Sequence, residues 1–318
     1  MDTPSNSMNA DSDAQLSEKL KGPSQPSTKV NFEIPRGACD CLTHIYGDFR
    51  RFPMASGRTY TPELASIAEI EALHRTLHVD RVVIIQPTLY GTDNSCTLDA
   101  VHQLGDRARG IAVVDPRTPS AALDEMADGG ICGIRINLET IGLTDPEIAR
   151  GRLRAAIEQV RNRTNWHIQM YTRLPIIEAI YDLLVASPVP VVLDHFAGVK
   201  ATHGTDEPGF ARVIDLLKSG KVYVKFTGPY LASKLGPDFS DLVPVARAFL
   251  EANSARILWG TNWPHPNAIP VKGRKNTDIA PLRRVDDGHL LNLLPTWVPT
   301  ADDRKAILVD NPAELYGF

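Results

Sequence analysis

Histidine, tyrosine and carboxylate side chains follow a short apolar segment near the start of the chain. The stretch GACDCLTHIYGD (residues 37–48) runs from mostly small and apolar residues into His44, Tyr46 and Asp48. A buried parallel strand has this composition when its C-terminal end delivers side chains into a site. Histidine titrates close to neutral pH, so His44 could carry a proton during a reaction. The stretch therefore predicts a strand that ends in a reactive site.

Polar side chains recur where other apolar segments of the chain end. In a β/α barrel the carboxyl ends of all strands meet at one face, so such side chains would converge there. Polar groups at nearly every strand end are more than packing requires. Further candidates of this kind are Thr88, Tyr90, Asp115, Arg135, Asn137, Tyr171, Asp194, His195, Lys225, Thr227, Asn262 and His265.

Structural roles compete with functional ones for several of these residues. His44 could be a hydrogen-bonded histidine behind the site, and Asp194–His195 could be a pair that ties down a loop. Arg135 could pair with Asp115, but we favour anion binding because arginine holds planar oxyanions with two hydrogen bonds. Ordinary packing or ion pairing could account for Tyr60, Tyr171 and Lys225.

The elements that must position these residues alternate along the chain. Apolar runs predict strands at Ala38–Ile45, Arg81–Gln86, Gly110–Val114, Gly133–Asn137, His167–Tyr171, Val191–His195, Val222–Phe226 and Arg256–Trp259. Helical patterns predict helices at Pro62–Leu77, Ser95–Leu104, Ser120–Asp128, Asp145–Asn162, Pro175–Val185, Pro208–Ser219, Asp241–Ala252 and Ala301–Val309. Such alternation predicts a parallel α/β sheet.

Eight strand–helix units in one chain favour a closed (β/α)8 TIM barrel over a doubly wound sheet. A doubly wound sheet that bound a nucleotide should carry a glycine-rich phosphate turn after its first strand, and none is present there. We expect a single barrel domain over residues 35–318. Residues 1–34 are rich in serine, aspartate, asparagine and proline, and we predict a disordered tail there.

Composition excludes several classes of partner. The formal net charge of −4 gives no basic footprint, so we expect no nucleic-acid partner. No stretch approaches the roughly 18 apolar residues of a membrane span, so we expect no membrane insertion. Cys39 and Cys41 would point in parallel from one strand face, which is a poor geometry for a disulfide between them. The spacing of Cys39, Cys41 and His44 also differs from that of known zinc fingers. We expect buried thiols and, without a secretory segment, a cytoplasmic enzyme.

Several motifs, taken in order, resemble a known family. GACDCLTHIYGD, GTDN, RGIAVVDP, GIRIN, VPVVLDHFAG, ILWGTNWPHPN and VDNPAELYGF are similar to the metal-independent branch of the amidohydrolase superfamily, amidohydrolase-related family 2. The resemblance covers roughly residues 35–318. It implies a distorted (β/α)8 barrel that acts on the carbonyl of a small-molecule lactone. It places around the substrate His44, Tyr60, Thr88, Tyr90, Arg135, Tyr171, His195 and Asn262.

The sequence departs from the hydrolases of that branch at informative positions. Leu42 stands where they have the first histidine of His-x-His, and Asn262 replaces the aspartate that takes a proton from water. Tyr90 takes a histidine position, and Ile141 and Leu231 stand where two substrate-binding arginines are expected. These losses argue against a planar dicarboxylate substrate. The changes at Leu42 and Asn262 resemble instead a sugar-acid lactone isomerase of the branch.

An amide cannot usefully accept a proton, so Asn262 is a poor base for hydrolysis. His44 and His195 alone make an incomplete metal shell, so we expect no metal and no cofactor. Lactone migration does not require a base that activates a water molecule, because the attacking hydroxyl already belongs to the substrate. Asn262 could orient that hydroxyl, and either histidine could carry the proton. The predicted substrate contacts are Tyr60, Thr88, Tyr90, Arg135, Tyr171, Lys225 and His265.

The sequence therefore favours a metal-independent isomerase of an aldarolactone-like substrate in carbohydrate acid catabolism. A lactone hydrolase is the nearest alternative, with His44 or His195 as its base, or Asp194 acting through a water. A third possibility, of another class, is a catalytically degenerate barrel that binds a small hydroxy acid without turning it over.

Overall fold

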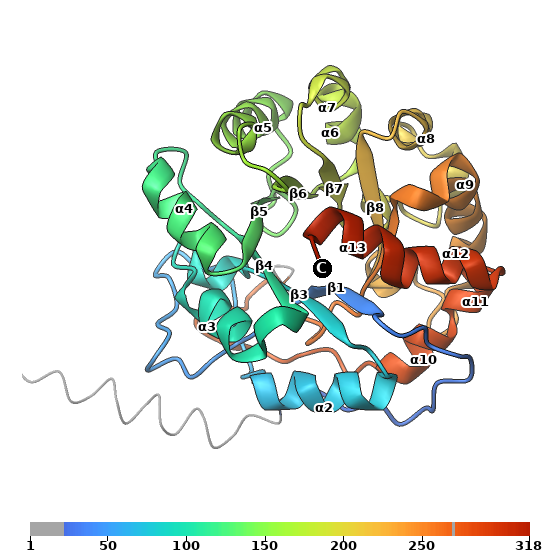
Figure 1. Cartoon of the computed structure of the whole chain (residues 1–318), viewed down its shortest axis with the longest axis horizontal. Coiled ribbons are helices and arrows are strands. Elements are labelled where there is room, and N and C mark those ends of the chain that lie inside the picture. The colour runs from blue at the N-terminus through green and yellow to red at the C-terminus, as the bar shows by residue number, and fades with distance from the viewer. Residues whose placement is uncertain (1–21, 269–270) are drawn as a thin grey trace, which may run out of the picture.

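The expected eight-stranded barrel is confirmed by the structure, a computed structural model that describes residues 22–268 and 271–318 (Figure 1). Its strands are all parallel and pair in chain order. Most are runs of branched and apolar residues because both faces of such a sheet are buried. The strands are β1 (Cys39–Thr43), β3 (Arg81–Ile85), β4 (Ala108–Ala112), β5 (Ile131–Asn137), β6 (His167–Tyr171), β7 (Val191–Leu193), β8 (Val222–Phe226) and β9 (Ile257–Trp259).

The barrel closes where β1 meets the turn after β9. The backbone N–H of His44 donates to the carbonyl of Trp263 at 2.8 Å, and the N–H of Asn262 donates to the carbonyl of Leu42 at 3.0 Å. A side chain at Gly260 would place its Cβ only 2.7 Å from the backbone nitrogen of Leu42. A glycine is therefore required at this close approach of the two chain segments. The seam carries two of the predicted catalytic residues.

Helices surround the barrel in the order that the sequence predicts, with local differences. The helices are α2 (Ile67–Leu77), α3 (Ser95–Leu104), α4 (Ser120–Asp128), α5 (Pro146–Val160), α6 (Leu174–Ala179), α7 (Tyr181–Ala186), α8 (Phe210–Lys218), α9 (Val243–Asn253), α10 (Asp287–Asn292), α11 (Leu294–Trp297), α12 (Ala301–Lys305) and α13 (Asn311–Tyr316). The single helix predicted over Pro175–Val185 is wrong, because the backbone leaves helical geometry at Ile180 and divides α6 from α7.

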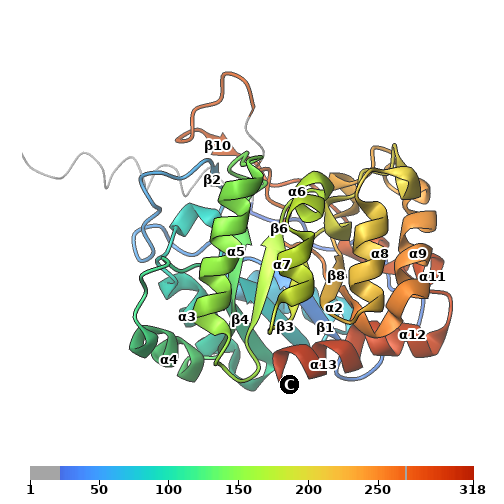
Figure 2. The same cartoon turned by 90° about the horizontal axis from the view of Figure 1, so that it is seen from above.

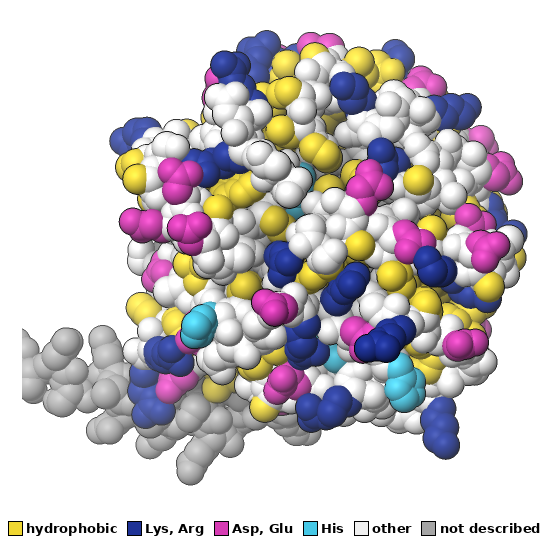
Figure 3. Space-filling model, in the orientation of Figure 1, with side chains coloured by type: hydrophobic (Ala, Val, Ile, Leu, Met, Phe, Trp, Pro, Cys, Tyr) yellow, Lys and Arg dark blue, Asp and Glu magenta, His cyan; other side chains and the backbone are white. Residues whose placement is uncertain are grey.

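The two ends of the barrel differ. Figure 2 shows the short strands β2 (Thr61–Pro62) and β10 (Ile279–Ala280) at one end and α13 with the C-terminus at the other. Tyr316 of α13 packs edge-on against His167, the first residue of β6, with ring centroids 5.2 Å apart. Helix α13 therefore covers the amino ends of the strands, and β2 and β10 lie at their carboxyl ends. On the face that carries α13, basic and acidic side chains are interspersed (Figure 3).

The chain ahead of β1 lies partly within the described residues. The predicted disordered tail comprises residues 1–34, of which residues 1–21 lie outside the part that the structure describes. The hydroxyl of Ser24 donates to the carbonyl of Val285 at 2.8 Å, and that of Thr28 donates to the Asp286 carboxylate at 2.8 Å. This segment has no regular secondary structure and is held against the chain that enters α10.

The four cysteines are buried and unpaired, as the sequence predicts: Cys39, Cys41, Cys96 and Cys132. Three of them belong to a buried cluster inside the barrel that also contains Tyr223 and Tyr316. Within residues 22–268 and 271–318, no helix combines the length and the apolar character that crossing a membrane requires.

Candidate active site

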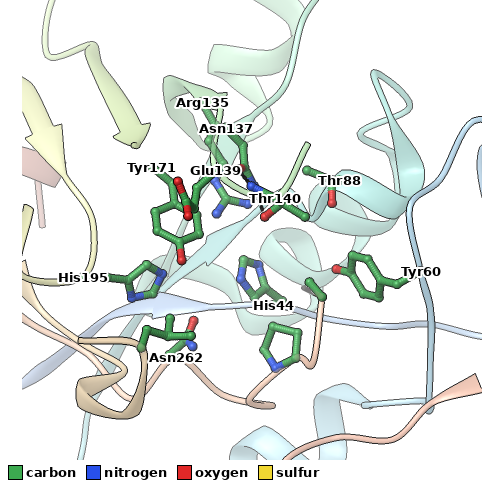
Figure 4. A pocket seen from close by; sticks show the side chains of 13 residues that line it. His44, Tyr60, Thr88, Arg135, Asn137, Glu139, Thr140, Tyr171, His195 and Asn262 are labelled. Carbon is green, nitrogen blue, oxygen red and sulfur yellow. Dashed lines mark hydrogen bonds between the residues drawn. The ribbon is translucent and has the colours of Figure 1, made fainter. Parts of the chain in front are cut away.

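A small cavity of about 90 Å³ opens at the carboxyl ends of the strands. Side chains from widely separated segments point into it (Figure 4). All three predicted catalytic residues line it, together with four of the seven predicted substrate contacts. The lining residues are His44, Tyr60, Thr88, Arg135, Asn137, Glu139, Thr140, Tyr171, His195, Leu231, Asn262, Pro266 and Ala268.

His44 follows β1 and presents a neutral imidazole to the cavity. Its Nδ1 lies 2.8 Å from the carbonyl oxygen of Ile85, which can only accept, so Nδ1 carries the proton. Nε2 is then the unprotonated nitrogen available to the cavity. Burial and the nearby Arg135 guanidinium lower the pKa of His44 to about 3. His44 is therefore a hydrogen-bond acceptor and potential base at neutral pH.

His195 follows β7 and is held in the same protonation state. Its Nδ1 lies 2.9 Å from the hydroxyl and 3.3 Å from the carbonyl of Thr227. The Tyr171 ring packs edge-on against the imidazole, with centroids 4.5 Å apart. Burial is the main cause that lowers the pKa of His195 to about 4, although the Asp194 carboxylate works in the opposite direction. The cavity thus contains two neutral imidazoles.

Asn262 lies in the turn after β9 and has a left-handed backbone, with φ of 66°. His195 has a similar backbone, with φ of 53°. Non-glycine residues adopt this conformation at a cost, and functional sites often contain such strain. Gly228 packs between the two side chains, because a Cβ there would lie 3.2 Å from both Asn262 Nδ2 and His195 Nδ1. The amide Nδ2 of Asn262 donates to the Tyr230 hydroxyl at 2.8 Å.

Arg135 supplies a permanent positive charge to the cavity from β5. Its Nη1 donates to the carbonyl of Gln86 at 3.1 Å, and its Nη2 lies 3.8 Å from the Asp194 carboxylate. Its Nε makes no hydrogen bond to any described residue. The alternative of pairing with a neighbouring carboxylate named the wrong residue, because Asp115 is a surface residue that pairs with Arg117, whereas the carboxylate beside Arg135 is Asp194. Because Nε is buried, the donors that Arg135 can turn toward an anionic ligand in the cavity belong to its Nη1 and Nη2 groups.

A buried polar cluster lies next to Arg135. Lys225 is fully buried and donates to the side-chain carbonyl of Gln169 at 2.7 Å, and its Nζ lies 3.7 Å from Asp194. The Gln169 amide donates to Asp194 at 3.0 Å. Burial lowers the pKa of Lys225, and the nearby Asp194 opposes that shift. Two cationic side chains thus share one carboxylate, and the resulting field favours an anionic ligand.

Tyrosine and threonine hydroxyls contribute the remaining polar lining. The Tyr60 hydroxyl lies 3.3 Å from that of Tyr46, and burial raises the pKa of Tyr60. Burial also raises the pKa of Tyr171, so these groups stay protonated and can donate hydrogen bonds. Thr88 begins the helical turn that follows β3 and lies beside them.

Three predicted substrate contacts do not line the cavity: Tyr90, Lys225 and His265. The Tyr90 hydroxyl accepts the backbone N–H of Gly47 at 3.0 Å. Lys225 takes part in the buried cluster with Gln169 and Asp194. His265 is fully buried, with Nδ1 2.9 Å from the Tyr230 hydroxyl. All three side chains therefore bind other protein groups, and only the path through His265 and Tyr230 leads directly to a lining residue, Asn262.

Sequence reasoning missed the residues that loops bring to the cavity. Glu139 lies in the loop after β5 and forms a two-pronged ion pair with Arg173 at 2.8 and 2.7 Å. Thr140 joins Asn137 through two hydrogen bonds of 3.0 Å. Pro266 and Ala268 come from the loop after β9. The only available signal was that Glu139 and Thr140 come just after the strand-end residue Asn137.

The donor set does not fit a divalent metal. In the described part of the chain, no three His, Cys, Asp or Glu side chains are arranged to hold an ion. Leu42 is apolar, Asn262 offers a neutral amide, and Asp194 is already shared by two cationic side chains. The positive charge of Arg135 would also oppose a second cation beside His44.

Known proteins are similar to this chain over most of its length. A family model described as Amidohydrolase matches residues 39–318. The chain is 32% identical to the 4-sulfomuconolactone hydrolase of Hydrogenophaga intermedia, covering 95% of this chain and 96% of that protein. It is 34% identical to a 2-pyrone-4,6-dicarboxylate hydrolase of Comamonas testosteroni, covering 91% and 93%.

An isomerase and a solved structure are also similar. The chain is 28% identical to the D-galactarolactone isomerase of Agrobacterium fabrum (strain C58 / ATCC 33970), covering 95% of this chain and 97% of that protein. A crystal structure of an Agrobacterium tumefaciens protein without ligand superposes with a TM-score of 0.75 at 25% identity. The superposition covers 90% of this chain and 97% of the Agrobacterium tumefaciens protein.

Proposed function

The chain belongs to the amidohydrolase family, and from this premise we propose that it isomerises a polyhydroxylated sugar-acid lactone without a metal. The observation that carries the proposal is Asn262, an amide in the cavity beside two neutral histidines. An amide can orient a hydroxyl group but cannot take its proton. A reaction in which the nucleophile is already part of the substrate suits that residue.

The proposed reaction moves the lactone bond from one hydroxyl to another. A free hydroxyl of the substrate, hydrogen-bonded to Asn262, attacks the ring carbonyl carbon. His44 takes the hydroxyl proton through its free Nε2, or His195 does so in the tautomer whose Nδ1–H donates to the Thr227 carbonyl. Arg135, Thr88 and Tyr171 donate hydrogen bonds to the oxyanion, a contribution of about 3 kcal/mol for a well-placed donor. The old ring C–O bond then breaks, and its oxygen receives the proton that the histidine holds.

The charges around the cavity favour a substrate with one free carboxylate. Arg135 adds a positive charge to the lining, and Glu139, which lies on the same side of the cavity in Figure 4, adds a negative charge that is already paired. Arg173 is already paired with Glu139, and Lys225 lies outside the cavity lining. Neither supplies a second anion clamp. A monolactone of an aldaric acid has one ring ester and one carboxylate, which matches this distribution.

A lactone hydrolase is the second candidate. It is favoured by two relatives of 32% and 34% identity that are named hydrolases. His44 or His195 would then activate a water molecule. Asp194 is a weaker choice of base, because its carboxylate is engaged by Gln169, Arg135 and Lys225. A barrel that only binds a small acid is the third candidate.

A time course of NMR spectra separates these candidates. Chelator-treated protein is mixed with a panel of aldaric and aldonic lactones in ¹⁸O-labelled water. Interconversion of two lactones without uptake of label is the expected result. Ring opening with ¹⁸O in the new carboxylate would overturn the isomerase in favour of the hydrolase. Thermal protection by a lactone that stays unchanged would indicate binding alone.

The variant Asn262→Asp tests the residue that carries the proposal. A carboxylate at this position can take a proton from water, so we expect label uptake to appear or to rise. The matched control is Asn137→Asp, which adds the same charge to another part of the same cavity. An equal gain of hydrolysis in both variants would show that charge, and not the position of Asn262, is responsible.

A further inference from the structure

A chain of hydrogen bonds runs from Asn262 away from the cavity. Asn262 Nδ2 lies 2.8 Å from the Tyr230 hydroxyl, which lies 2.9 Å from Nδ1 of His265. Nε2 of His265 lies 3.1 Å from both carboxylate oxygens of Asp287. Four side chains thus form one continuous path that ends at a residue of the cavity.

Separate elements hold this path in place. Tyr230 lies in the helical turn Pro229–Leu231 after β8, and Asp287 is the first residue of α10. Asn262 and His265 share the turn after β9, where the N–H of His265 donates to the carbonyl of Asn262 at 2.8 Å. His265 and Asp287 are fully buried. Hydrogen bonds within the path satisfy both ring nitrogens of His265 and Oδ2 of Asp287.

Each hydrogen bond along the path runs from a donor to an acceptor, and the protonation state of Asp287 decides in which direction the whole path runs. An ionised carboxylate can only accept, so Nε2 of His265 carries a proton, and in a ring that holds a single proton Nδ1 is an acceptor. The Tyr230 hydroxyl must then donate to Nδ1. Its oxygen is left to accept, and an amide N–H of Asn262 supplies the donor. The hydrogen bond from Nε2 reaches Oδ2 of Asp287 at 3.1 Å, whereas Oδ1 lies at the same distance without making a hydrogen bond to any described residue.

We propose that Tyr230, His265 and Asp287 are positioning residues that turn the Asn262 carbonyl oxygen, and not its NH₂ group, toward the cavity. The substrate group that Asn262 recognises is then a hydrogen-bond donor, namely a hydroxyl. This assignment deepens the proposed lactone isomerisation and rests on it for its catalytic meaning. It requires the attacking hydroxyl to donate to Asn262 before its proton passes to a histidine.

The reverse direction would assign a different substrate group. A protonated Asp287 would donate to Nε2, Nδ1 would donate to Tyr230, and Tyr230 would donate to the Asn262 carbonyl. The NH₂ group would then face the cavity and recognise an acceptor such as a lactone carbonyl. Burial raises the pKa of Asp287 while His265 lowers it, so this carboxyl is where the direction is set.

The tautomer of His265 distinguishes the two directions without any substrate. Protein with ¹⁵N-labelled histidine is measured by long-range ¹H–¹⁵N correlation at neutral pH, and the His265 signals are assigned by their loss in His265→Gln. We expect a proton on Nε2 and none on Nδ1. A proton on Nδ1 in the wild-type protein would overturn the proposal.

The variant Tyr230→Phe removes the link between His265 and Asn262. We expect the Nδ1 signal of His265 to shift and, on a lactone that the wild-type enzyme converts, kcat to fall by about 100-fold with little change in KM. Tyr223→Phe is the matched control, because that hydroxyl lies toward α13, hydrogen-bonded to Arg256 at 2.9 Å. Equal loss of kcat in both variants would contradict a positioning role.

A second pair of variants tests His265 without relying on Tyr230. His265→Gln retains one acceptor and one donor, whereas His265→Leu retains neither, so Gln should preserve more of kcat than Leu. Equal values of kcat in two folded variants would overturn the role of the path. If no lactone reacts but the Nε2 tautomer is found, the proposed reaction fails while the orientation of Asn262 stands.

Discussion

His44 and His195 are suited to accept protons because the cavity keeps both of them uncharged. Burial acts first on each pKa, and the permanent charge of Arg135 lowers both further. Each ring also uses Nδ1 to bind a neighbouring segment, so Nε2 remains for the substrate. Arg135 therefore has two effects, since it offers a donor to an anion and it holds the imidazoles neutral.

Two substitutions of Arg135 separate these effects. Arg135→Lys keeps the charge but loses the planar fork, so KM should rise while the pKa of His44 changes little. Arg135→Met removes both, so KM should rise by about 10- to 100-fold, the range expected for losing a charge-assisted hydrogen bond. The pKa of His44 should rise as well. NMR titration of the histidines and steady-state kinetics provide the measurements.

The surface variant Arg154→Met, on the exposed side of α5, serves as the control for these measurements. A pKa of His44 that stays unchanged in Arg135→Met would show that burial alone keeps this ring neutral.

Sequence reasoning found the site residues that stand at strand ends. His44, Arg135, Tyr171, His195 and Asn262 all lie within three residues of the carboxyl end of a predicted strand, and all line the cavity. Their convergence follows from the parallel barrel, in which the carboxyl end of every strand meets one face. The type of side chain then indicates the chemistry.

Residues supplied by loops escaped the same reasoning. Tyr230 lies in a helical turn and Asp287 begins the short helix α10, and the placement of both elements depends on tertiary packing. Tyr90, Lys225 and His265 follow or end strands, yet their side chains bind other protein groups instead of lining the cavity. Sequence indicates which end of the barrel a residue occupies but not the direction and depth of its side chain.

At the scale of elements, Asp40 joins the two sides of the barrel seam. Its carboxylate accepts the hydroxyl of Thr261 at 2.6 Å and the backbone N–H of Thr261 at 2.9 Å. Nε2 of His74 in α2 lies 3.3 Å from the same carboxylate. One buried acid thus ties β1 to the turn after β9 and to a covering helix, and that turn carries Asn262.

The substitution Asp40→Asn should destabilise the protein by about 2 to 4 kcal/mol. An amide can satisfy only some of these donors, and leaving a buried donor without a partner is costly. Urea unfolding followed by circular dichroism measures the change in the free energy of unfolding. Asp48→Asn is the control, because this exposed acid pairs only with Arg50 in the described structure and should change stability by less than about 1 kcal/mol. Equal changes would show that the seam does not depend on Asp40.

The strands were easier to predict than the helices, because a strand buried on both faces is a continuous apolar run that is easily recognised in the sequence. The helix predicted from Pro62 instead begins at Ile67, because Thr61 and Pro62 pair with β10 and Ser66 forms the N-cap. The partner strand comes from more than 200 residues later in the chain, so local patterns could not reveal it.

At the scale of the whole molecule, buried neutral histidines occur at both ends of the barrel. His44 and His195 lie at the cavity, and His167 packs against Tyr316 at the end covered by α13. Burial is the main cause that lowers the pKa of His44 and His167 to about 3 and of His195 to about 4. Although the two regions lie at opposite ends of the barrel, protonation of the histidines in each of them opposes folding.

This linkage predicts that acid destabilises the protein well above the pH at which carboxylates titrate. In the unfolded chain these histidines take up protons near pH 6.5, whereas in the folded protein they do so only near pH 3 to 4. Between these values the unfolded state binds more protons, so the free energy of unfolding falls as the pH falls. Each histidine contributes at most about 1.4 kcal/mol per pH unit.

Urea unfolding at a series of pH values between 7.5 and 4.5 measures the slope, and substitution of His167 isolates one contribution. His167→Leu removes a titrating group that is outside the cavity, so the slope should decrease by about 1.4 kcal/mol per pH unit. His102→Gln, at an exposed position of α3, should leave the slope unchanged. Burial raises the pKa of Asp287, so this residue makes the free energy of unfolding rise as the pH falls. Its single contribution opposes those of the three histidines. A stability that stays constant from pH 6.5 to 4.5 would contradict the neutral state of the histidines, and with it the electrostatic basis of the proposed site.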